Sequence, residues 1–501
     1  MKINRRDFLA GIGATGATAV LANHEKITNA ARNLKPVFLP TILRASGGGS
    51  LNFITIMCDS LRYDHVGFLG NSWIQTPNID GFASQSQVFD RAYAGGYPTV
   101  LNRMELFLGR FMYPRHGWEN MPSDTAVLAQ LMNDLGYTTG IVFDTWHLKH
   151  AGFNFERGYQ SWQWIRGQEG DLYRAAPRDL ALPADPHKFR SADTVRQYLR
   201  NVQGRAGEAD YFIAQTIETA VTWLQNHHFA SPFYLHIDAF DPHEPWDPPQ
   251  EYINLYNPGY QGQAVIYPAY APPDYLSAAE LAHMQALYAA EVSLVDTWLG
   301  ILFAEIDALG LANNTIVTLM ADHGILLGEH NGVGKTWSHQ GHFEAYPLYQ
   351  ELAHIPLMIR VPGLSPQRLT TLVQPPDVVA TMLDMAGAPV PSYMHGRSLQ
   401  PYMQGASGSP RAVTISTPSM KQSLATKPRI TVSDGEWTLL HGAGHASSEL
   451  YYLPDDPGQQ NNLLATNCDT AVTLHHQMVD FLQSIDTPAD RLAPWQIAPC
   501  P

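Results

Sequence analysis

The chain has 501 residues, of which 45% are hydrophobic, and its formal net charge is −15. This length and composition support a large buried core, so we expect one large domain and a smaller one rather than a disordered chain. Nucleic-acid binding needs clustered Lys and Arg that neutralise phosphates, so the acidic balance argues against a nucleic-acid partner. A small anionic ester held by local positive charge is compatible with it.

The N-terminal segment resembles a twin-arginine export signal. Arg5 and Arg6 stand just before Phe8 and Leu9, and a mildly apolar run rich in Gly, Ala and Thr follows over residues 10–22. This run is too short for a membrane span, which needs roughly 20 apolar residues. We therefore predict that residues 1–22 are a signal peptide read by the twin-arginine export machinery, and that the mature protein is soluble in the periplasm or secreted.

Strands and helices alternate after residue 50. Residues 23–50 lack periodicity and end in Ser-Gly-Gly-Gly-Ser, which predicts a flexible lead-in. The pattern then predicts strands at 51–58, 137–143, 232–240 and 314–320, a helix from Ser123-Asp124 to Gly136, and a long amphipathic helix over 277–309. This alternation indicates an α/β domain over residues 51–395 with a largely parallel sheet, in which sites form outside the carboxyl ends of the strands.

The last hundred residues differ in character. Short strands are expected at 412–416, 429–433 and 437–441, and a closing helix at 471–485, so residues 396–501 form a small α+β subdomain. The three cysteines, Cys58, Cys468 and Cys500, are too few for a disulfide framework. A single bridge between Cys468 and Cys500 stays open in an oxidising compartment.

Two predicted strands end in residues that bind metals. Asp59 follows the strand at 51–58, and Asp322-His323 follows the strand at 314–320. Carboxylate oxygens and an imidazole nitrogen from neighbouring strand ends are ligands for a divalent cation. An aspartate at a strand end is more often a turn or cap residue, so neither segment identifies a metal site by itself.

Thr99 begins another segment with chemical potential. It follows a proline and precedes an apolar run, which predicts a helix N-cap. A hydroxyl at a helix N-terminus lies in a positive dipole, which favours its ionised form and a bound anion. Metal coordination would lower its pKa further and make it a nucleophile, and Arg103 lies one turn later on the same side.

Further segments follow in a fixed order. The first are Asp59-Ser60-Leu61-Arg62-Tyr63-Asp64, Thr76-Pro77-Asn78-Ile79-Asp80, Phe89-Asp90-Arg91-Ala92-Tyr93 and the stretch from Thr99 to Arg110. The later ones are Trp146-His147-Leu148, Asp241-Pro242-His243-Glu244-Pro245, Ala321-Asp322-His323-Gly324, Leu352-Ala353-His354-Ile355-Pro356 and Glu449-Leu450-Tyr451-Tyr452-Leu453. In order and spacing they resemble the sulfatase family of the alkaline-phosphatase superfamily over about residues 51 to 470.

The resemblance implies a fold and a set of site residues. The expected fold is sulfatase/alkaline-phosphatase-like, with a large mixed, mostly parallel sheet flanked by helices and a smaller β-rich C-terminal domain. By position, the metal ligands would be Asp59, Thr99, Asp322 and His323, and the catalytic residues Thr99, Arg103, His147, His243 and Lys335. Ser60 replaces a second family ligand, and His339 or His342 could share the role of Lys335.

Two departures from the family pattern bear on the chemistry. Sulfatases carry Cys or Ser at the position of Thr99 and oxidise it to formylglycine, which threonine cannot form. Relatives that handle phosphoryl groups, such as nucleotide phosphodiesterases, use an unmodified Thr. Thr145 stands where sulfatases have a lysine, and the loss of this cation favours a singly charged diester over a doubly charged group.

These observations favour a metal-dependent hydrolase that cleaves a phosphodiester or phosphonate monoester through a covalent Thr99 intermediate. Two alternatives stay open: a sulfuric ester hydrolase without formylglycine, and a non-catalytic binding protein on the same fold. The substrate would be a small-molecule, glycan or lipid anionic ester. We expect one divalent ion, Ca²⁺, Mn²⁺ or Mg²⁺ with Zn²⁺ also possible, because no clear second ligand set is present.

Overall fold

The largest sheet has eight strands and is mixed but mostly parallel. Its order is β13 (Gln367–Val373), β2 (Gln87–Ala92), β12 (Leu357–Arg360), β7 (Thr315–Ala321), β1 (Asn52–Cys58), β6 (Phe233–Ala239), β4 (Thr138–Phe143) and β5 (Ser161–Trp164). Only β12 runs antiparallel to its neighbours. The four strands predicted before residue 321 are confirmed as β1, β4, β6 and β7, and the fold class agrees with the prediction.

The computed structural model describes residues 50–149, 152–230, 232–339, 342–421, 428–444 and 447–500. The predicted signal peptide at 1–22 and the lead-in up to residue 49 lie outside these residues. So do the side chains of 338–343, which include the two alternative histidines, His339 and His342.

The three central strands place the candidate ligands. Every residue of β1, β6 and β7 is buried, as expected for strands covered on both faces. β1 pairs in parallel with both neighbours, so that Cys58 lies opposite Ala239 on one side and Ala321 on the other. The residues that follow these three positions therefore emerge together at one edge of the sheet.

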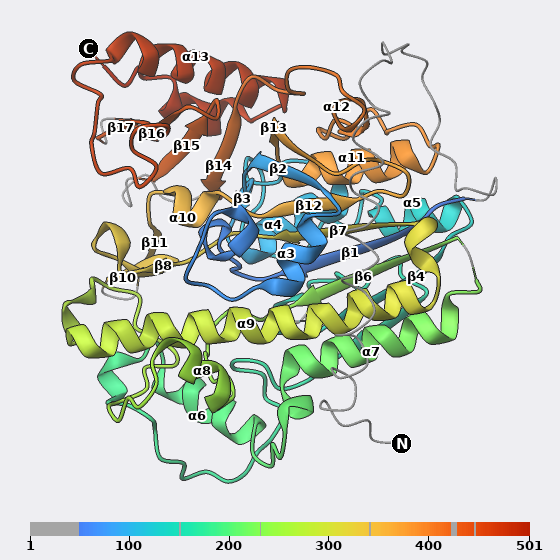
Figure 1. Ribbon diagram of the computed structural model, residues 1–501. Coiled ribbons are helices and arrows are strands. Elements are labelled where there is room, and N and C mark those ends of the chain that lie inside the picture. The colour runs from blue at the N-terminus through green and yellow to red at the C-terminus, as the bar shows by residue number, and fades with distance from the viewer. Residues whose placement is uncertain are drawn as a thin grey trace, which may run out of the picture. The chain divides into compact units, whose positions relative to one another are not determined.

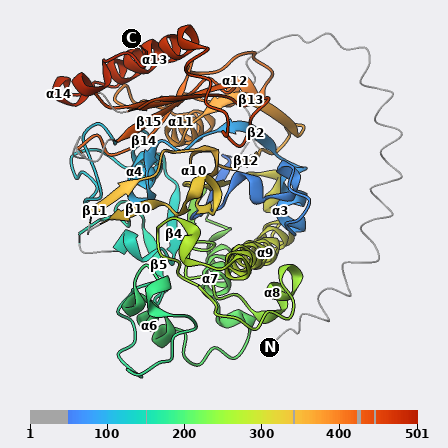
Figure 2. The same cartoon turned by 90° about the vertical axis from the view of Figure 1, so that its left-hand side faces the viewer.

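Helices cover both faces of this sheet. α4 (Thr99–Leu108) and α11 (Pro375–Met385) pack against one another on one face, and α7 (Phe212–His227) and α9 (Ala278–Ala308) lie on the other (Figures 1 and 2). α9 begins with a capping box between Ser277 and Glu280, which confirms the predicted helix start. By length and composition α9 could cross a membrane, but 83% of its apolar window is buried within the fold.

One predicted helix start is wrong. The helix before β4 is α5 (Leu128–Asp134), and Val127 rather than Ser123-Asp124 occupies its N-cap position. The backbone N–H of Val127 donates to the side chain of Gln130 at 3.1 Å, and the Val127 side chain is fully buried. Burial of an apolar anchor and a glutamine acceptor therefore set this helix start instead of the polar pair upstream.

The C-terminal residues build a second sheet of five strands. Its order is β17 (Glu449–Tyr452), β16 (Trp437–Gly442), β15 (Arg429–Ser433), β14 (Thr414–Pro418) and β3 (Gly96–Tyr97). The short strand β3 directly precedes Pro98 and Thr99, so this sheet is continuous in sequence with the start of α4. The boundaries predicted for the two domains stay a prediction.

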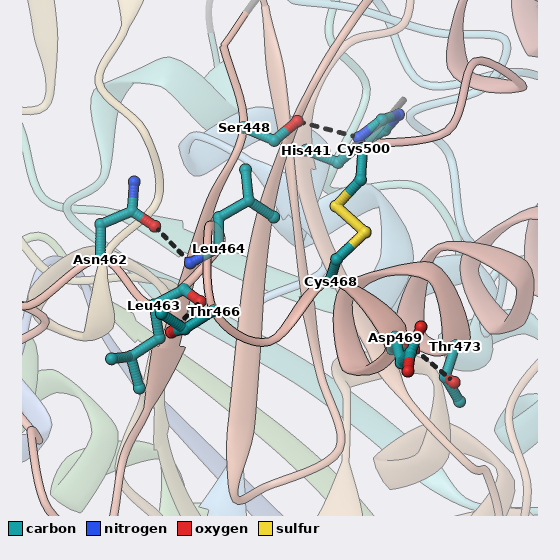
Figure 3. Close-up of a disulfide and its surroundings, with 10 residues drawn as sticks. All are labelled: His441, Ser448, Asn462, Leu463, Leu464, Thr466, Cys468, Asp469, Thr473 and Cys500. Carbon is teal, nitrogen blue, oxygen red and sulfur yellow. Dashed lines mark hydrogen bonds between the residues drawn. A yellow bond between two sulfur atoms is a disulfide. The ribbon is translucent and has the colours of Figure 1, made fainter.

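A disulfide closes the C-terminal region. Cys468, the first residue of α13 (Cys468–Ser484), is bonded to Cys500 (Figure 3). The pairing left open by the sequence is therefore present, and Cys58 is free and buried. The remaining elements are α3 (Pro77–Ala83), α6 (Ala192–Asn201), α8 (Gln250–Tyr256), β8 (Leu326–Leu327), β9 (Val333–Gly334), β10 (Thr336–His339), β11 (His342–Ala345), α10 (Gln350–Ala353), α12 (Gln400–Met403) and α14 (Ala489–Leu492).

Candidate active site

The carboxyl ends of β1 and β7 bring three predicted metal ligands together. Asp59 follows β1 directly, and Asp322 and His323 follow β7. All three side chains are buried, and one ligand atom from each lies within 4.8 Å of the others. Two carboxylates and an imidazole at this separation form a set that could hold a divalent cation.

The unsatisfied atoms of this cluster fit a bound cation. Asp59 Oδ2 is buried and accepts no hydrogen bond from the described residues, and its ion-pair neighbour is Arg103 Nη1 at 3.1 Å. His323 Nδ1 lies 2.9 Å from the carbonyl oxygen of Gly324, so Nδ1 carries the ring proton and Nε2 presents a lone pair. A divalent cation would satisfy both the carboxylate oxygen and this lone pair.

Thr99 is the first residue of α4, not its N-cap as predicted. Pro98 occupies the N-cap position with an extended backbone. Helix boundaries read from sequence shift easily by one residue, and a proline sits readily in the extended conformation that precedes a helix. Thr99 Oγ1 lies 3.2 Å from His323 Nε2 instead, so the hydroxyl points toward the ligand cluster. Thr99 itself lies at the N-terminal, positive end of α4.

Arg103 is enclosed by three carboxylates. Its Nη1 lies 2.6 Å from Asp322 Oδ2 and 3.1 Å from Asp59 Oδ2, while Nη2 lies 2.8 Å from Asp238 Oδ1. The side chain is 0% exposed. A buried guanidinium persists only when it is paired and hydrogen-bonded, and these pairs fix the relative positions of both ligand carboxylates.

The local charges keep the ligands in their metal-binding forms. Burial raises the pKa of Asp322, but His323 and Arg103 outweigh it, and the net pKa lies below its ordinary value. Burial lowers the pKa of His323, against the pull of Asp322 and Asp59. At neutral pH the site therefore holds an ionised carboxylate beside a neutral imidazole.

Asp238 is a site residue that the sequence reasoning missed. Its carboxylate accepts from Arg103 Nε at 2.9 Å and from the Thr145 hydroxyl at 2.5 Å. Thr145 is fully buried, so the residue at the family's lysine position contributes a hydroxyl to Asp238 and no charge. Its position inside the predicted buried strand at 232–240 could have identified it, because a buried charge needs a partner.

Lys335 and His243 join the site through Glu244. Lys335 Nζ lies 3.8 Å from Asp59 Oδ1 and 3.5 Å from Glu244 Oε2, and that same Glu244 oxygen lies 3.4 Å from His243 Nδ1. All of these side chains are nearly or fully buried. Burial lowers the pKa of His243 well below its ordinary value, and the Lys335 charge lowers it further. His243 is therefore neutral.

His147 lies against Glu169 in an aromatic setting. Its Nε2 is 3.4 Å from Glu169 Oε2, which also accepts from Trp146 Nε1 at 2.7 Å. Trp118 contacts the same imidazole edge-on, with ring centroids 5.0 Å apart. Burial, reinforced by nearby arginine and lysine charges, lowers the pKa of His147 to about 3, so its ring is neutral at physiological pH.

The predicted residues fall into two groups by contact. Asp59, Thr99, Arg103, Asp322 and His323 contact one another, with Lys335 next to them. His147 and His243 are linked to buried glutamates, neither of which had been assigned a role. Glu244 belongs to the segment Asp241-Pro242-His243-Glu244-Pro245, whereas Glu169 lies in a loop without any local sequence pattern. The catalytic roles of all these residues stay predictions.

A separate cavity of about 700 Å³ lies beside the end of β5. Its lining includes Trp164, Arg166, Tyr173, Arg205 and Phe212. None of the predicted site residues is among those that line it. The candidate active site is therefore defined by the charged cluster at the strand ends and not by this cavity.

Two family models match the chain. The model described as Sulfatase matches residues 51–388, which is more than half of the chain, and the model described as N-sulphoglucosamine sulphohydrolase, C-terminal, matches residues 338–485. The first match spans every predicted site residue. The second begins within β10 and includes β11 and the strands β14, β15, β16 and β17 of the five-stranded sheet.

Individual proteins show the same likeness. The chain is 23% identical to an ulvan-active sulfatase of Formosa agariphila, over 82% of this chain and 77% of that protein. It is 22% identical to an N-acetylglucosamine-6-O-sulfatase of Bacteroides thetaiotaomicron, over 82% of each. Among solved structures, a phosphonate monoester hydrolase of Agrobacterium radiobacter matches with a TM-score of 0.68 and 18% identity, over 88% of this chain and 96% of that one. That structural likeness concerns the fold.

Proposed function

Because the chain belongs to the sulfatase family of hydrolases, we propose that it cleaves a singly charged phosphoester, a phosphodiester or phosphonate monoester, with Thr99 as its nucleophile. The main observation that supports this proposal is the position of the Thr99 hydroxyl, which lies 3.2 Å from His323 Nε2 in the candidate metal cluster. A nucleophile needs an activating neighbour, and a divalent cation held by this cluster would supply it.

The proposed reaction has two displacements. The Thr99 oxygen attacks phosphorus, the bond from phosphorus to the leaving oxygen breaks, and a phosphoryl-Thr99 ester forms. Water then attacks the same phosphorus, which releases the acid and restores the hydroxyl. A divalent cation held by Asp59, Asp322 and His323 would lower the pKa of the Thr99 hydroxyl and neutralise developing charge.

Two cations of the chain support this step. Lys335 is buried beside Asp59, where its ammonium stabilises the equatorial oxygens of the transferring group. Arg103 holds the carboxylates of Asp59 and Asp322 in place. Its positive charge also acts on the transferring group, because these carboxylates lie next to Thr99. Catalysis of phosphoryl transfer depends mainly on such positioning and charge stabilisation.

The leaving oxygen must receive a proton, and His147 is better placed to supply it than His243. His243 Nδ1 lies against the carbonyl oxygen of Glu244, which holds its one ring proton away from substrate. His147 Nε2 adjoins Glu169 at 3.4 Å, and burial raises the pKa of Glu169 above its ordinary value. We assign protonation of the leaving group to the His147–Glu169 pair.

Sulfate-ester hydrolysis is the second candidate function. Two of the proteins named above are sulfatases, and they match most of the chain at 22–23% identity. Two observations favour the phosphoester. Thr99 cannot form the aldehyde on which the family's sulfate chemistry depends, and Thr145 adds no cation for a more highly charged group.

The covalent adduct on Thr99 distinguishes these functions. Purified protein is mixed briefly with an aryl phosphodiester or an aryl sulfate, and its peptides are analysed by mass spectrometry. We expect a phosphoryl adduct on Thr99 with the first ester, whereas a sulfuryl adduct with the second would establish the sulfatase function. Absence of both adduct and turnover would leave the binding-protein alternative.

Substitution of Thr99 provides the matched kinetic test. Thr99→Ala removes the attacking oxygen, so kcat/KM should fall by about 10³-fold or more, while Thr99→Ser keeps measurable activity. Thr216→Ala is the control, because Thr216 is equally buried but lies in α7 away from the cluster. Full activity of Thr99→Ala on every hydrolysed ester would rule out this nucleophile.

Removal of the metal by a chelator should abolish activity in the wild type.

A further inference from the structure

Trp118 is an exposed aromatic residue beside the candidate proton donor. Its side chain is 49% exposed, although its ring contacts the His147 imidazole. The loop that carries it is fixed on both sides: Ser419 Oγ donates to the His116 carbonyl oxygen, and Lys421 pairs with Glu119 at 2.8 Å. A large aromatic ring held in place with half its surface in water offers a stacking face to a ligand.

Arg190 is held on the other side of Glu169. Its guanidinium lies over the Tyr270 ring, 4.4 Å from the centroid, and Nη1 donates to the hydroxyl oxygens of Tyr267 at 3.1 Å and Tyr270 at 3.4 Å. About a third of the side chain, 32%, is exposed. A guanidinium has five N–H donors in a rigid fork, so this one is positioned by Nη1 and still presents donors to an anion.

The buried glutamates near Arg190 have closer partners of their own. Arg190 Nη1 lies 3.8 Å from Glu169 and 3.9 Å from Glu244, beyond hydrogen-bond distance. Glu169 accepts from Tyr267 at 2.5 Å, and Glu244 accepts from the Tyr270 hydroxyl. The strongest donors to these carboxylates are therefore phenols, which leaves the exposed side of the guanidinium available to a carboxylate or ester oxyanion.

These residues form one continuous row. Trp118 contacts His147, His147 contacts Glu169, and Glu169 lies beside Arg190. The His147–Glu169 pair assigned to the leaving oxygen lies in the middle of this row, so a group attached to that oxygen would have Trp118 on one side and Arg190 on the other.

We propose that Trp118 and Arg190 form a leaving-group subsite for a six-membered ring that carries a second negative charge. Trp118 stacks on the face of the ring, and Arg190 binds its carboxylate or second ester oxyanion. This inference rests on the function proposed above, because it names the alcohol that the hydrolase releases. The preferred substrate is then an anionic sugar or aryl ester with at least two charges, one at the reacting group and one on the ring.

The first test compares two esters that differ by one carboxylate. The 4-nitrophenyl ester and the 3-carboxy-4-nitrophenyl ester of the same acid are assayed with wild type and Arg190→Gln. Loss of a charge-assisted hydrogen bond should lower kcat/KM on the carboxylated ester by about tenfold or more relative to kcat/KM on the other ester. Equal losses on both esters would mean that Arg190 only balances Glu169 and Glu244, and would overturn the proposal.

Arg166→Gln is the matched control for this charge removal. Arg166 also lies over an aromatic ring, pairs with a buried aspartate and is 38% exposed, but it belongs to the separate cavity. It should leave the preference between the two esters unchanged. Trp118→Ala should lower kcat/KM by about fivefold on both aryl esters and leave kcat/KM on a methyl ester unchanged. Trp162→Ala, at a similarly exposed tryptophan, should not change kcat/KM on any of the three esters.

A binding experiment separates this proposal from the proposed function. Calorimetry measures the affinity of the released alcohols alone, 5-hydroxy-2-nitrobenzoate and 4-nitrophenol, so no catalysis is needed. We expect tighter binding of the carboxylated phenol by wild type and loss of that preference in Arg190→Gln. If this preference exists without turnover of any ester, the subsite stands and the hydrolase function fails. Turnover without this preference would overturn the subsite alone.

Discussion

Asp238 controls the candidate site although it is not one of the expected ligands. It lies within β6, is 0% exposed and pairs with Arg103 through both Nε and Nη2. Burial raises the pKa of Asp238, but Arg103 outweighs it and the net pKa is far below normal, so the carboxylate is ionised. Arg103 is thereby anchored to β6 while it reaches the ligands at the ends of β1 and β7.

Asp238→Asn should therefore weaken both the fold and the cation site. Asparagine keeps the shape but removes the charge, which leaves the buried guanidinium short of one partner. We expect the free energy of unfolding to fall by about 3 kcal/mol and the affinity for a divalent cation by about tenfold. Chemical denaturation and calorimetric titration with Mn²⁺ measure these quantities.

Asp193→Asn is the control for loss of a carboxylate from an arginine pair. Asp193 is 94% exposed and pairs with Arg196 one turn later in α6, so its removal should cost less than about 1 kcal/mol. If Asp238→Asn were as mild as this control, the proposed anchoring of Arg103 through β6 would be wrong.

At the scale of elements, α4 is fixed at both ends by one of its own residues. Glu105 accepts from the backbone N–H of Gly96 before the helix and from that of Met112 after it, each at 2.9 Å. Burial raises the pKa of Glu105 to about 8, against these donors. The carboxyl group thus joins β3, α4 and the following loop, and it holds the helix whose first residue is Thr99.

Gly95 is needed for this arrangement. A Cβ atom added at Gly95 would overlap Glu105 Oε2, whereas one added at Gly81 in α3 would meet nothing within 4 Å. We expect Gly95→Ala to lower the free energy of unfolding by about 2 kcal/mol and to reduce kcat. Gly81→Ala should raise stability by about 0.5–1 kcal/mol and leave kcat unchanged. Unchanged stability in the first variant would contradict the role given to Glu105.

The sequence predicted those elements whose signal is local. β1, β4, β6 and β7 appeared within one or two residues of their predicted bounds, because each is a continuous buried run between turn residues. The pairing of β3 with β14 could not be predicted, since a two-residue strand has no periodicity and its partner lies more than 300 residues away in the chain. The start of α5 was missed because a buried valine outweighed a local polar signal.

The site followed a similar division. Asp59, Asp322 and His323 were predictable because the carboxyl ends of parallel strands meet at one edge. The ion pairs of Arg103 with Asp238 and the contact of His147 with Glu169 depend on which side chains face one another across elements. Neither spacing nor residue type encodes that information in a single sequence. The position of Arg190 likewise depends on its contacts with Tyr267 and Tyr270, which the sequence alone does not predict.

At the scale of the whole molecule, several buried or half-buried histidines are held in neutral form. Burial lowers the pKa values of four of them to about 3 or 4: His147, His354, His395 and His441. His354 is stacked between two tyrosines, with its ring centroid 3.6 Å from that of Tyr63 and 4.9 Å from that of Tyr93. Such groups bind protons more readily in the unfolded chain, which makes the fold sensitive to acid.

His354 carries the last prediction. Its pKa is about 4 in the fold against an ordinary value of 6.5, so between these limits the unfolded chain binds more protons and stability falls as the pH is lowered. Asp241 and Asp296, whose pKa values burial raises to about 6, act in the opposite sense over the same range. The total slope therefore mixes several groups, and the contribution of His354 must be obtained from a variant.

His354→Gln keeps an amide that can donate to the Asp90 carbonyl oxygen but cannot be protonated. Wild type should be the more stable at pH 7, and its advantage should shrink by up to ~3 kcal/mol as the pH falls from 6.5 to 4. Denaturant titrations at several pH values measure this difference. His187→Gln, at an exposed histidine, is the control for the loss of an imidazole from the surface. A constant difference for His354→Gln would mean that His354 accepts its proton equally in the folded and unfolded chain.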